Sequence, residues 1–136
     1  CIRDRATQEA AARVYREHAL ADAPPIISSL NIAVADTSAA ARDLLLPEAY
    51  AKVRAQSTGE FATLRPAGEL DMDALTGQQR RRIEEALAHD VWGTVEEVRE
   101  ELRGVGKRLG VSEFVVTGDM PDVGGRARSE ELLASL

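Results

Sequence analysis

The sequence predicts an α/β protein that is mostly helical and contains two β/α units of a parallel sheet. Residues 89–136 have the pattern of a complete helix–strand–helix unit, and an alternating apolar segment at 26–35 predicts a second strand followed by a helix. The length of 136 residues permits one domain. Two parallel strands, however, are too few for a covered sheet or a closed barrel. We therefore expect residues 1–136 to form a single partial domain.

The first half of the chain predicts a helix, a strand and a longer helical region. Residues 6–20 are rich in helix formers, and a Pro-Pro pair stops them. Both faces of the strand at 26–35 carry apolar or small side chains, so both can be buried. Cap-forming residues at 36–38 then precede a helix rich in alanine and leucine, which Pro47 either kinks or restarts. A second helical segment is expected to end at Gln56.

Residues 57–75 interrupt the pattern with scattered glycines, one proline and no sustained period. Long connections of this kind tend to be functional or mobile, so we expect an irregular insertion here. Thr76 and Gln79 have the spacing of a capping box and predict a helix that runs through Ala88. Residues 89–92 are then expected to be a simple link to the last unit.

The last unit has the clearest local signals. Thr94 and Glu97 form a second capping box in front of apolar residues at helical spacing, and Gly110 supplies the left-handed residue that ends such a helix. Residues 114–116, Phe-Val-Val, are too short for a helix and predict a strand that is buried on both faces. A glycine-bearing loop and a closing helix complete the unit.

Charge and composition exclude several classes of function. With 17 basic and 23 acidic residues the formal charge is −6, so we expect no nucleic-acid partner and no anionic membrane. No apolar run reaches the roughly 20 residues of a membrane span. The single cysteine, Cys1, excludes an intrachain disulfide and fits a cytoplasmic location, and at the chain end it is not a credible nucleophile. A first residue that is not methionine suggests a processed product or a truncated reading frame.

The sequence predicts neither a metal site nor a nucleotide-binding loop. His18 and His89 lack a second ligand at metal-binding spacing. Gly124 and Gly125 are not followed by the Lys-Ser/Thr pair of a phosphate-binding loop. These two glycines could still offer backbone donors to a phosphate at the start of the closing helix.

Several segments resemble the carboxyl end of the bacterial luciferase-like flavin-dependent monooxygenases. These are WGTVEEVREEL at 92–102, LGVSEFVVTGD at 109–119 and GRARSEELLASL at 125–136, and LNIAVADTSAAARDLL at 30–45 resembles the family's seventh strand and the helix after it. The resemblance implies that this chain is the carboxyl-terminal part, about the last two β/α units, of a (β/α)8 TIM barrel. It also implies that residues 57–75 are an insertion over the active site.

The resemblance further implies a function for the parent protein. Members of the family use reduced FMN or, in some branches, F420, and the oxygenases insert one oxygen atom from dioxygen into an organic substrate. We therefore expect part of a flavin-dependent oxidoreductase that is inactive alone, with FMN favoured over F420. The expected partners are the missing amino-terminal part of the barrel and a small organic substrate. A small non-enzymatic α/β interaction or oligomerisation module, such as a homo-oligomer, stays open as the alternative.

Barrel geometry places ligand sites at the carboxyl ends of the strands. The residues that follow the two predicted strands would therefore form the lip of a substrate or cofactor pocket: Asp36, Thr37, Thr117, Gly118 and Asp119. Each also has a structural interpretation, the first two as helix caps and the others as turn formers. No catalytic residue is predicted, because most flavin contacts of the family come from earlier strands.

Overall fold

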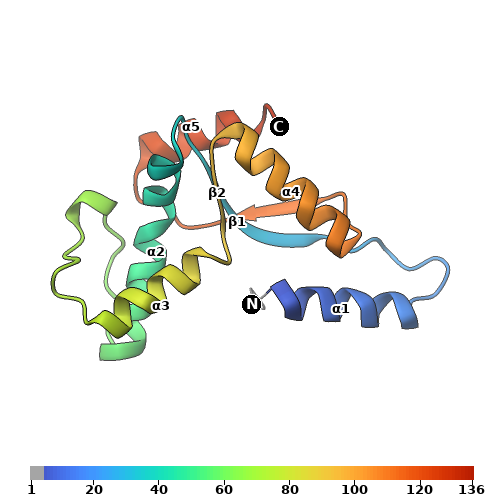
Figure 1. The fold of residues 1–136 in the computed structure, drawn as a ribbon, viewed down its shortest axis with the longest axis horizontal. Helices are drawn as coiled ribbons and strands as arrows, with labels where there is room; N and C mark the ends of the chain where they lie inside the picture. The colour runs from blue at the N-terminus through green and yellow to red at the C-terminus, as the bar shows by residue number, and fades with distance from the viewer. Residues whose placement is uncertain (1–4) are drawn as a thin grey trace.

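The structure, a computed structural model, describes residues 5–136, so Cys1 lies outside the described range. The elements follow in the order α1 (Arg5–His18), β1 (Ser28–Val34), α2 (Ser38–Thr58), η1 (Ala67–Glu69), α3 (Gly77–Leu87), β2 (Val91–Gly93), α4 (Val95–Leu109), β3 (Phe114–Thr117) and α5 (Val123–Leu133) (Figure 1). Helices dominate and the strands pair in parallel, which confirms the predicted α/β class.

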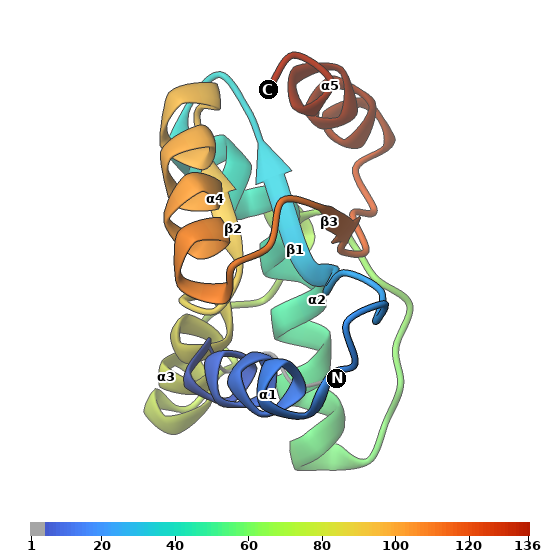
Figure 2. The ribbon, with the colours of Figure 1, turned by 90° about the vertical axis from the view of Figure 1, so that its right-hand side faces the viewer.

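The sheet has the strand order β2-β1-β3 (Figure 2). Residues 32–34 of the central strand β1 pair with residues 91–93 of β2, and residues 28–31 pair with residues 114–117 of β3. The two outer strands are therefore staggered along β1. The expectation that residues 89–92 form a simple link was wrong. A three-residue strand is too short to show a sequence period, and pairing with β1 defines it.

Helices cover both faces of this sheet. The chain first crosses from β1 to β2 through α2 and α3, and then returns past β1 to β3 through α4. Because right-handed crossovers in opposite directions lie on opposite faces of a sheet, α4 is expected opposite α2 and α3. One core cluster joins Ala33 of β1 to residues of α2 and α3, and the other joins Ile32 and Val34 to residues of α4. This arrangement is that of a doubly wound open sheet. In a (β/α)8 barrel, by contrast, consecutive strands are neighbours.

The helix boundaries follow the local sequence signals. Both predicted capping boxes are present, at Thr76 with Gln79 and at Thr94 with Glu97, and the α4 C-cap Gly110 has a left-handed φ of 60°. α2, however, continues through Pro47 as one helix, so of the two alternatives, a kink or a restart, the restart does not occur. The proline is almost completely buried.

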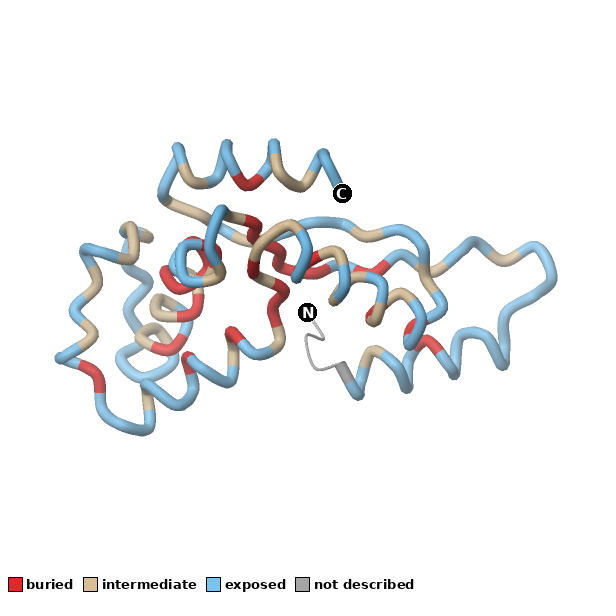
Figure 3. Tube along the Cα trace, turned by 45° about the horizontal axis from the view of Figure 1, so that its top comes forward, coloured by how far each residue is buried: buried red, intermediate tan, exposed pale blue. Residues whose placement is uncertain are grey.

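The strand β3 is less buried than predicted. Val115 and Val116 keep 49% and 46% of their surface exposed, and successive side chains of a strand point to opposite faces. The strand is therefore open on both faces, and the prediction of two-sided burial was wrong. The buried residues gather around β1 and the helices next to it (Figure 3), whereas β3 lies at the edge of the sheet.

The first two residues of the predicted insertion at 57–75 still belong to α2, and residues 59–76 include only the short helix η1. The two halves of this segment differ in packing. Leu70, Met72 and Leu75 pack against the core of α2 and α3, whereas Phe61 in the first half is 93% exposed. Across residues 5–136, no helix is both long enough and apolar enough to span a lipid bilayer.

Candidate functional site

An open pocket of about 580 Å³ lies at the carboxyl ends of β1 and β3. Its walls come from residues 35–37 after β1, residues 121–122 after β3, the first halves of α2 and α5, and η1. In an open α/β sheet, a ligand crevice forms where neighbouring strands send their connections to opposite faces. β1 leads to α2, which packs in the core cluster on one face of the sheet. β3 leads to α5, whose last residues pack against the α4 residues on the other face. The pocket therefore occupies the position that this topology favours for a ligand.

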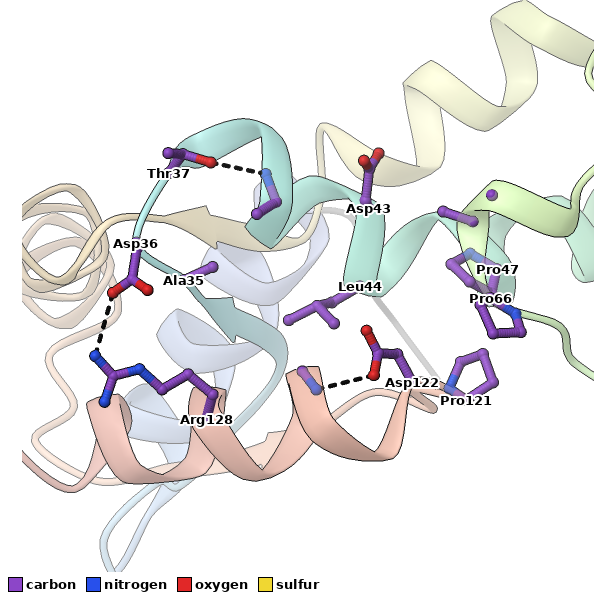
Figure 4. Close-up of a pocket in the computed structure, with 14 residues that line it drawn as sticks. Ala35, Asp36, Thr37, Asp43, Leu44, Pro47, Pro66, Pro121, Asp122 and Arg128 are labelled. Carbon is purple, nitrogen blue, oxygen red and sulfur yellow. Dashed lines mark hydrogen bonds and ion pairs between the residues drawn. The ribbon is translucent and has the colours of Figure 1, made fainter.

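An ion pair spans the rim of this pocket (Figure 4). Nη2 of Arg128, on α5, lies 3.2 Å from Oδ1 of Asp36, which directly follows β1. The hydrogen bond and the charge of Asp36 raise the pKa of the Arg128 guanidinium above its ordinary value, and Glu131 adds to the effect. Both side chains of the pair are exposed, so water and salt screen their attraction. The pair can thus open at little cost and present one charge of each sign to a ligand.

Two helix caps complete the rim. The Thr37 hydroxyl accepts the N–H of Ala40 at 3.2 Å, so this predicted lip residue is the N-cap of α2. Asp122 is the N-cap of α5, where its Oδ1 accepts the N–H of Gly125 at 2.9 Å. The Asp122 carboxylate therefore occupies the position in which the sequence had suggested a bound phosphate.

The charges of the pocket disfavour a phosphate as well. Asp36, Asp43 and Asp122 contribute three carboxylates to its lining, against the single guanidinium of Arg128. The rest of the lining is mainly aliphatic, with Leu44 and several proline and alanine residues. The pocket thus suits an organic molecule with a small polar end better than a phosphoryl group.

The other three predicted lip residues do not line this pocket. Thr117 and Asp119 instead join a polar network with Asn31 of β1 and Glu48 of α2. The Thr117 hydroxyl donates to Asn31 Oδ1 at 2.8 Å, and the Asn31 amide donates to Glu48 Oε2 at 3.2 Å. The backbone N–H of Asp119 donates to the same carboxylate oxygen at 3.2 Å. Gly118, with a φ of +126°, makes the turn between them.

Asn31 and Glu48 were not predicted as site residues. Asn31 is 5% exposed within an apolar strand, and a buried amide requires hydrogen-bond partners, so the sequence did carry a signal for it. Glu48 carries no such signal, because a glutamate on a helix is normally solvated. The network ties α2 to both β1 and β3, and a second open pocket of about 560 Å³ lies beside it, lined by Glu48 and Asp119 among others.

The loop after β1 is held by two further contacts. The N–H of Val34 donates to the buried Ser129 Oγ at 2.9 Å, which fixes α5 to the end of β1. Glu97 accepts a hydrogen bond from the Ser38 hydroxyl at 2.6 Å and from the Thr94 N–H at 2.8 Å. The bond from Ser38, followed by those from Thr94, lowers the pKa of the Glu97 carboxyl. No group of three His, Cys, Asp or Glu side chains in the described part of the chain could hold a metal ion.

Comparison with known proteins gives a structural likeness. No family model matches the sequence, and no curated protein matches it. Among solved structures, the crystal structure of apo-MsnO8 matches 94% of this chain with a TM-score of 0.73 and 24% sequence identity. The match covers 40% of the MsnO8 chain, so this chain spans less than half of that protein's length. At this identity the likeness establishes the fold alone: the chain is similar in fold to one part of MsnO8.

Proposed function

We propose that this chain is the carboxyl-terminal part of a luciferase-like, flavin-dependent oxidoreductase or monooxygenase. The observation that carries the proposal is the structural match to MsnO8. The match covers 94% of this chain but only 40% of the MsnO8 chain, as expected for one part of a longer protein. The segments that resemble the family supply support from the sequence, since they form β1, α4, β3 and α5. The alternative, F420 in place of FMN, is less favoured.

Within the parent enzyme, the pocket at the ends of β1 and β3 would contribute to the lip of the organic substrate site. The aliphatic lining around Leu44 would hold the carbon skeleton of the substrate, and the pair of Asp36 and Arg128 would orient its polar end. The residues present here do not fit the phosphate of FMN, because carboxylates predominate and Asp122 already caps α5. Other parts of the parent would therefore hold the flavin, which supplies the redox chemistry when bound.

The functional test uses the longer reading frame that contains this chain. The parent should bind reduced FMN and consume dioxygen when an organic substrate is present. Arg128→Ala should raise KM for the substrate while it leaves FMN affinity unchanged, because Arg128 lies on the substrate side. Arg126→Ala, on the same helix but outside the pocket lining, is the matched control. A parent that neither binds reduced FMN nor consumes dioxygen would refute the proposal.

The proposed parent is a (β/α)8 barrel, which makes a second, structural test. Consecutive strands are neighbours in a barrel, so β3 would lie beside β2 in the parent rather than beside β1. Ser29 and Val115 are opposite one another in the β1–β3 pair. In a Cys1→Ser background, cysteines at both positions should form a disulfide in this chain alone and stay reduced in the parent. A disulfide in both proteins would show that the parent keeps an open sheet.

The open edge at β3 favours a second candidate, a non-enzymatic α/β module that pairs with another copy of itself. Val115 and Val116 are half exposed there. Light scattering and denaturant unfolding of the 136-residue chain separate the two candidates. A monodisperse oligomer that unfolds cooperatively would favour the module, whereas a poorly packed monomer would favour the incomplete enzyme.

A further inference from the structure

The pocket at the carboxyl ends of β1 and β3 has an ion pair at one end. Nη2 of Arg128 lies 3.2 Å from Oδ1 of Asp36, and both side chains are more than half exposed. A ligand that separates the pair must give the guanidinium an acceptor and the carboxylate a donor, because an ion deprived of its partner weakens binding. The carboxylate and ammonium groups of an α-amino acid meet both requirements together.

Another carboxylate stands farther along the pocket. Oδ1 of Asp122 caps α5, whereas Oδ2 has no hydrogen-bond partner among the described residues. In Figure 4 this free oxygen points away from α5, toward Leu44. Asp122 precedes Arg128 by six residues, which corresponds to about 9 Å along the axis of α5. A short aliphatic chain, extended by the reach of the two side chains, spans such a separation.

The wall between these two polar groups is apolar. A Cβ atom at Gly125 would stand 2.5 Å from Cδ2 of Leu44 and 2.8 Å from Oδ2 of Asp122, so the leucine methyl lies close to the free carboxylate oxygen. The missing side chain of Gly125 lets both groups approach α5. Pro47 and Pro121 extend the wall. An aliphatic chain can therefore lie along Leu44 with a polar group at Asp122.

The charge of the lining selects the sign of that second polar group. The three aspartates of the pocket outnumber its single arginine, and Glu131 lies 3.4 Å from Nη1 of that arginine. The third aspartate, Asp43, makes a 4.0 Å contact with the neighbouring Arg42. An additional positive charge on the ligand is therefore stabilised in this pocket, whereas an additional negative charge is destabilised.

We propose that this pocket binds a basic α-amino acid with an aliphatic side chain of about the length of lysine. Its α-carboxylate binds Arg128, and its α-ammonium binds Asp36. Its four-carbon stem packs on Leu44, and its terminal ammonium donates to Oδ2 of Asp122. That such a molecule is the substrate of the parent enzyme rests on the proposed function.

The test measures the affinities of four related compounds for the 136-residue chain by NMR titration at about pH 7. Each reference compound lacks one charge of L-lysine: L-norleucine lacks the terminal ammonium, 6-aminohexanoate the α-ammonium and 1,5-diaminopentane the carboxylate. We expect lysine to bind about tenfold or more tightly than each of the three, since each lost charge removes a charge-assisted hydrogen bond. Shift changes should appear at the backbone amides of residues 36, 122 and 128.

Two substitutions address the two ends of the ligand separately. Asp122→Asn keeps a capping side chain but removes its charge, so lysine should bind about as weakly as norleucine, whose own affinity should not change. Arg128→Gln should abolish the preference for lysine over 1,5-diaminopentane. Arg126→Gln, on the same helix but outside the lining, is the control and should leave all four affinities within about threefold. Because each readout is a ratio within one variant, a loss of stability would not mimic it.

Three results would overturn the proposal. They are no binding of lysine, equal binding of any compound that lacks one of its charges, and unchanged selectivity in either Asp122→Asn or Arg128→Gln. Lysine binding requires neither flavin nor dioxygen, so an inactive parent would refute only the proposed enzymatic function. Flavin-dependent activity without lysine binding would refute only the assignment of the ligand.

Discussion

The two edge strands of the sheet, β2 and β3, differ in how far helices cover their side chains. β2 lies between α2 and α4, and Val91 within it is 2% exposed. β3 is of similar length and also rich in valine, yet Val115 is half exposed. Composition therefore does not explain the difference. α2 and α4 contact β2, whereas both faces of β3 stay open within the described chain.

The largest expected effect contrasts one valine from each edge. Val91→Asp would bury a carboxylate without a partner and should lower the free energy of unfolding by about 3–5 kcal/mol, enough to unfold the chain. Val115→Asp should cost less than about 1 kcal/mol, because its side chain already meets water. Urea denaturation followed by circular dichroism measures both values. Equal losses would show that β3 is as well covered as β2.

The next effect concerns Ser129 on α5. β3 pairs only with residues 28–31 of β1, and farther along the same edge of β1 the Ser129 hydroxyl accepts the N–H of Val34. Ser129→Ala would leave the N–H of Val34 buried without its acceptor and should cost about 1–3 kcal/mol. Ser135→Ala is the matched control, since that exposed hydroxyl bonds only near the end of the chain. Urea midpoints of the two variants should therefore differ clearly. Similar midpoints would mean that water replaces the lost hydroxyl.

A smaller effect is expected at the junction of β3 with the polar network. Thr117→Val keeps the β-branched shape but removes the hydrogen bond to Asn31 Oδ1, which should cost about 1 kcal/mol. Hydrogen exchange of the β3 amides should accelerate more than that of the β2 amides. Uniform acceleration across both edges would argue that β3 does not open separately from the rest of the sheet.

The smallest effect is the pH dependence contributed by Glu97. Hydrogen bonds from Ser38 and Thr94 lower the pKa of this carboxyl in the folded state, so the ionised form stabilises the fold. This contribution is present above the unfolded-state pKa and is lost as pH falls through the folded-state pKa. Glu97→Gln should therefore reduce the acid dependence of the urea midpoint between about pH 6 and pH 3. A urea midpoint with the same acid dependence in both proteins would show that water screens the hydrogen bonds of the exposed Glu97 side chain.

The sequence anticipated those parts of the fold whose interactions are local. Each capping box joins residues three positions apart, at Thr76 with Gln79 and at Thr94 with Glu97, so both helix starts were predictable. The alternation of apolar residues likewise located β1. Of the predicted lip residues, Asp36 and Thr37 directly follow β1 and line a pocket, while their role in binding a substrate or cofactor stays a prediction.

The tertiary structure decided everything that depends on distant partners. Arg128 meets Asp36 across 92 positions of sequence, and Glu48 meets Asn31 across 17, so no local pattern announces either contact. The position of β2 and the exposure of β3 likewise depend on segments that are distant in the sequence. A strand is defined by its neighbours, and the apolar run at 114–116 specifies a side-chain preference without specifying what covers it. Sequence thus determined the helices and their caps, while packing determined the strand order, the pocket and the open edge.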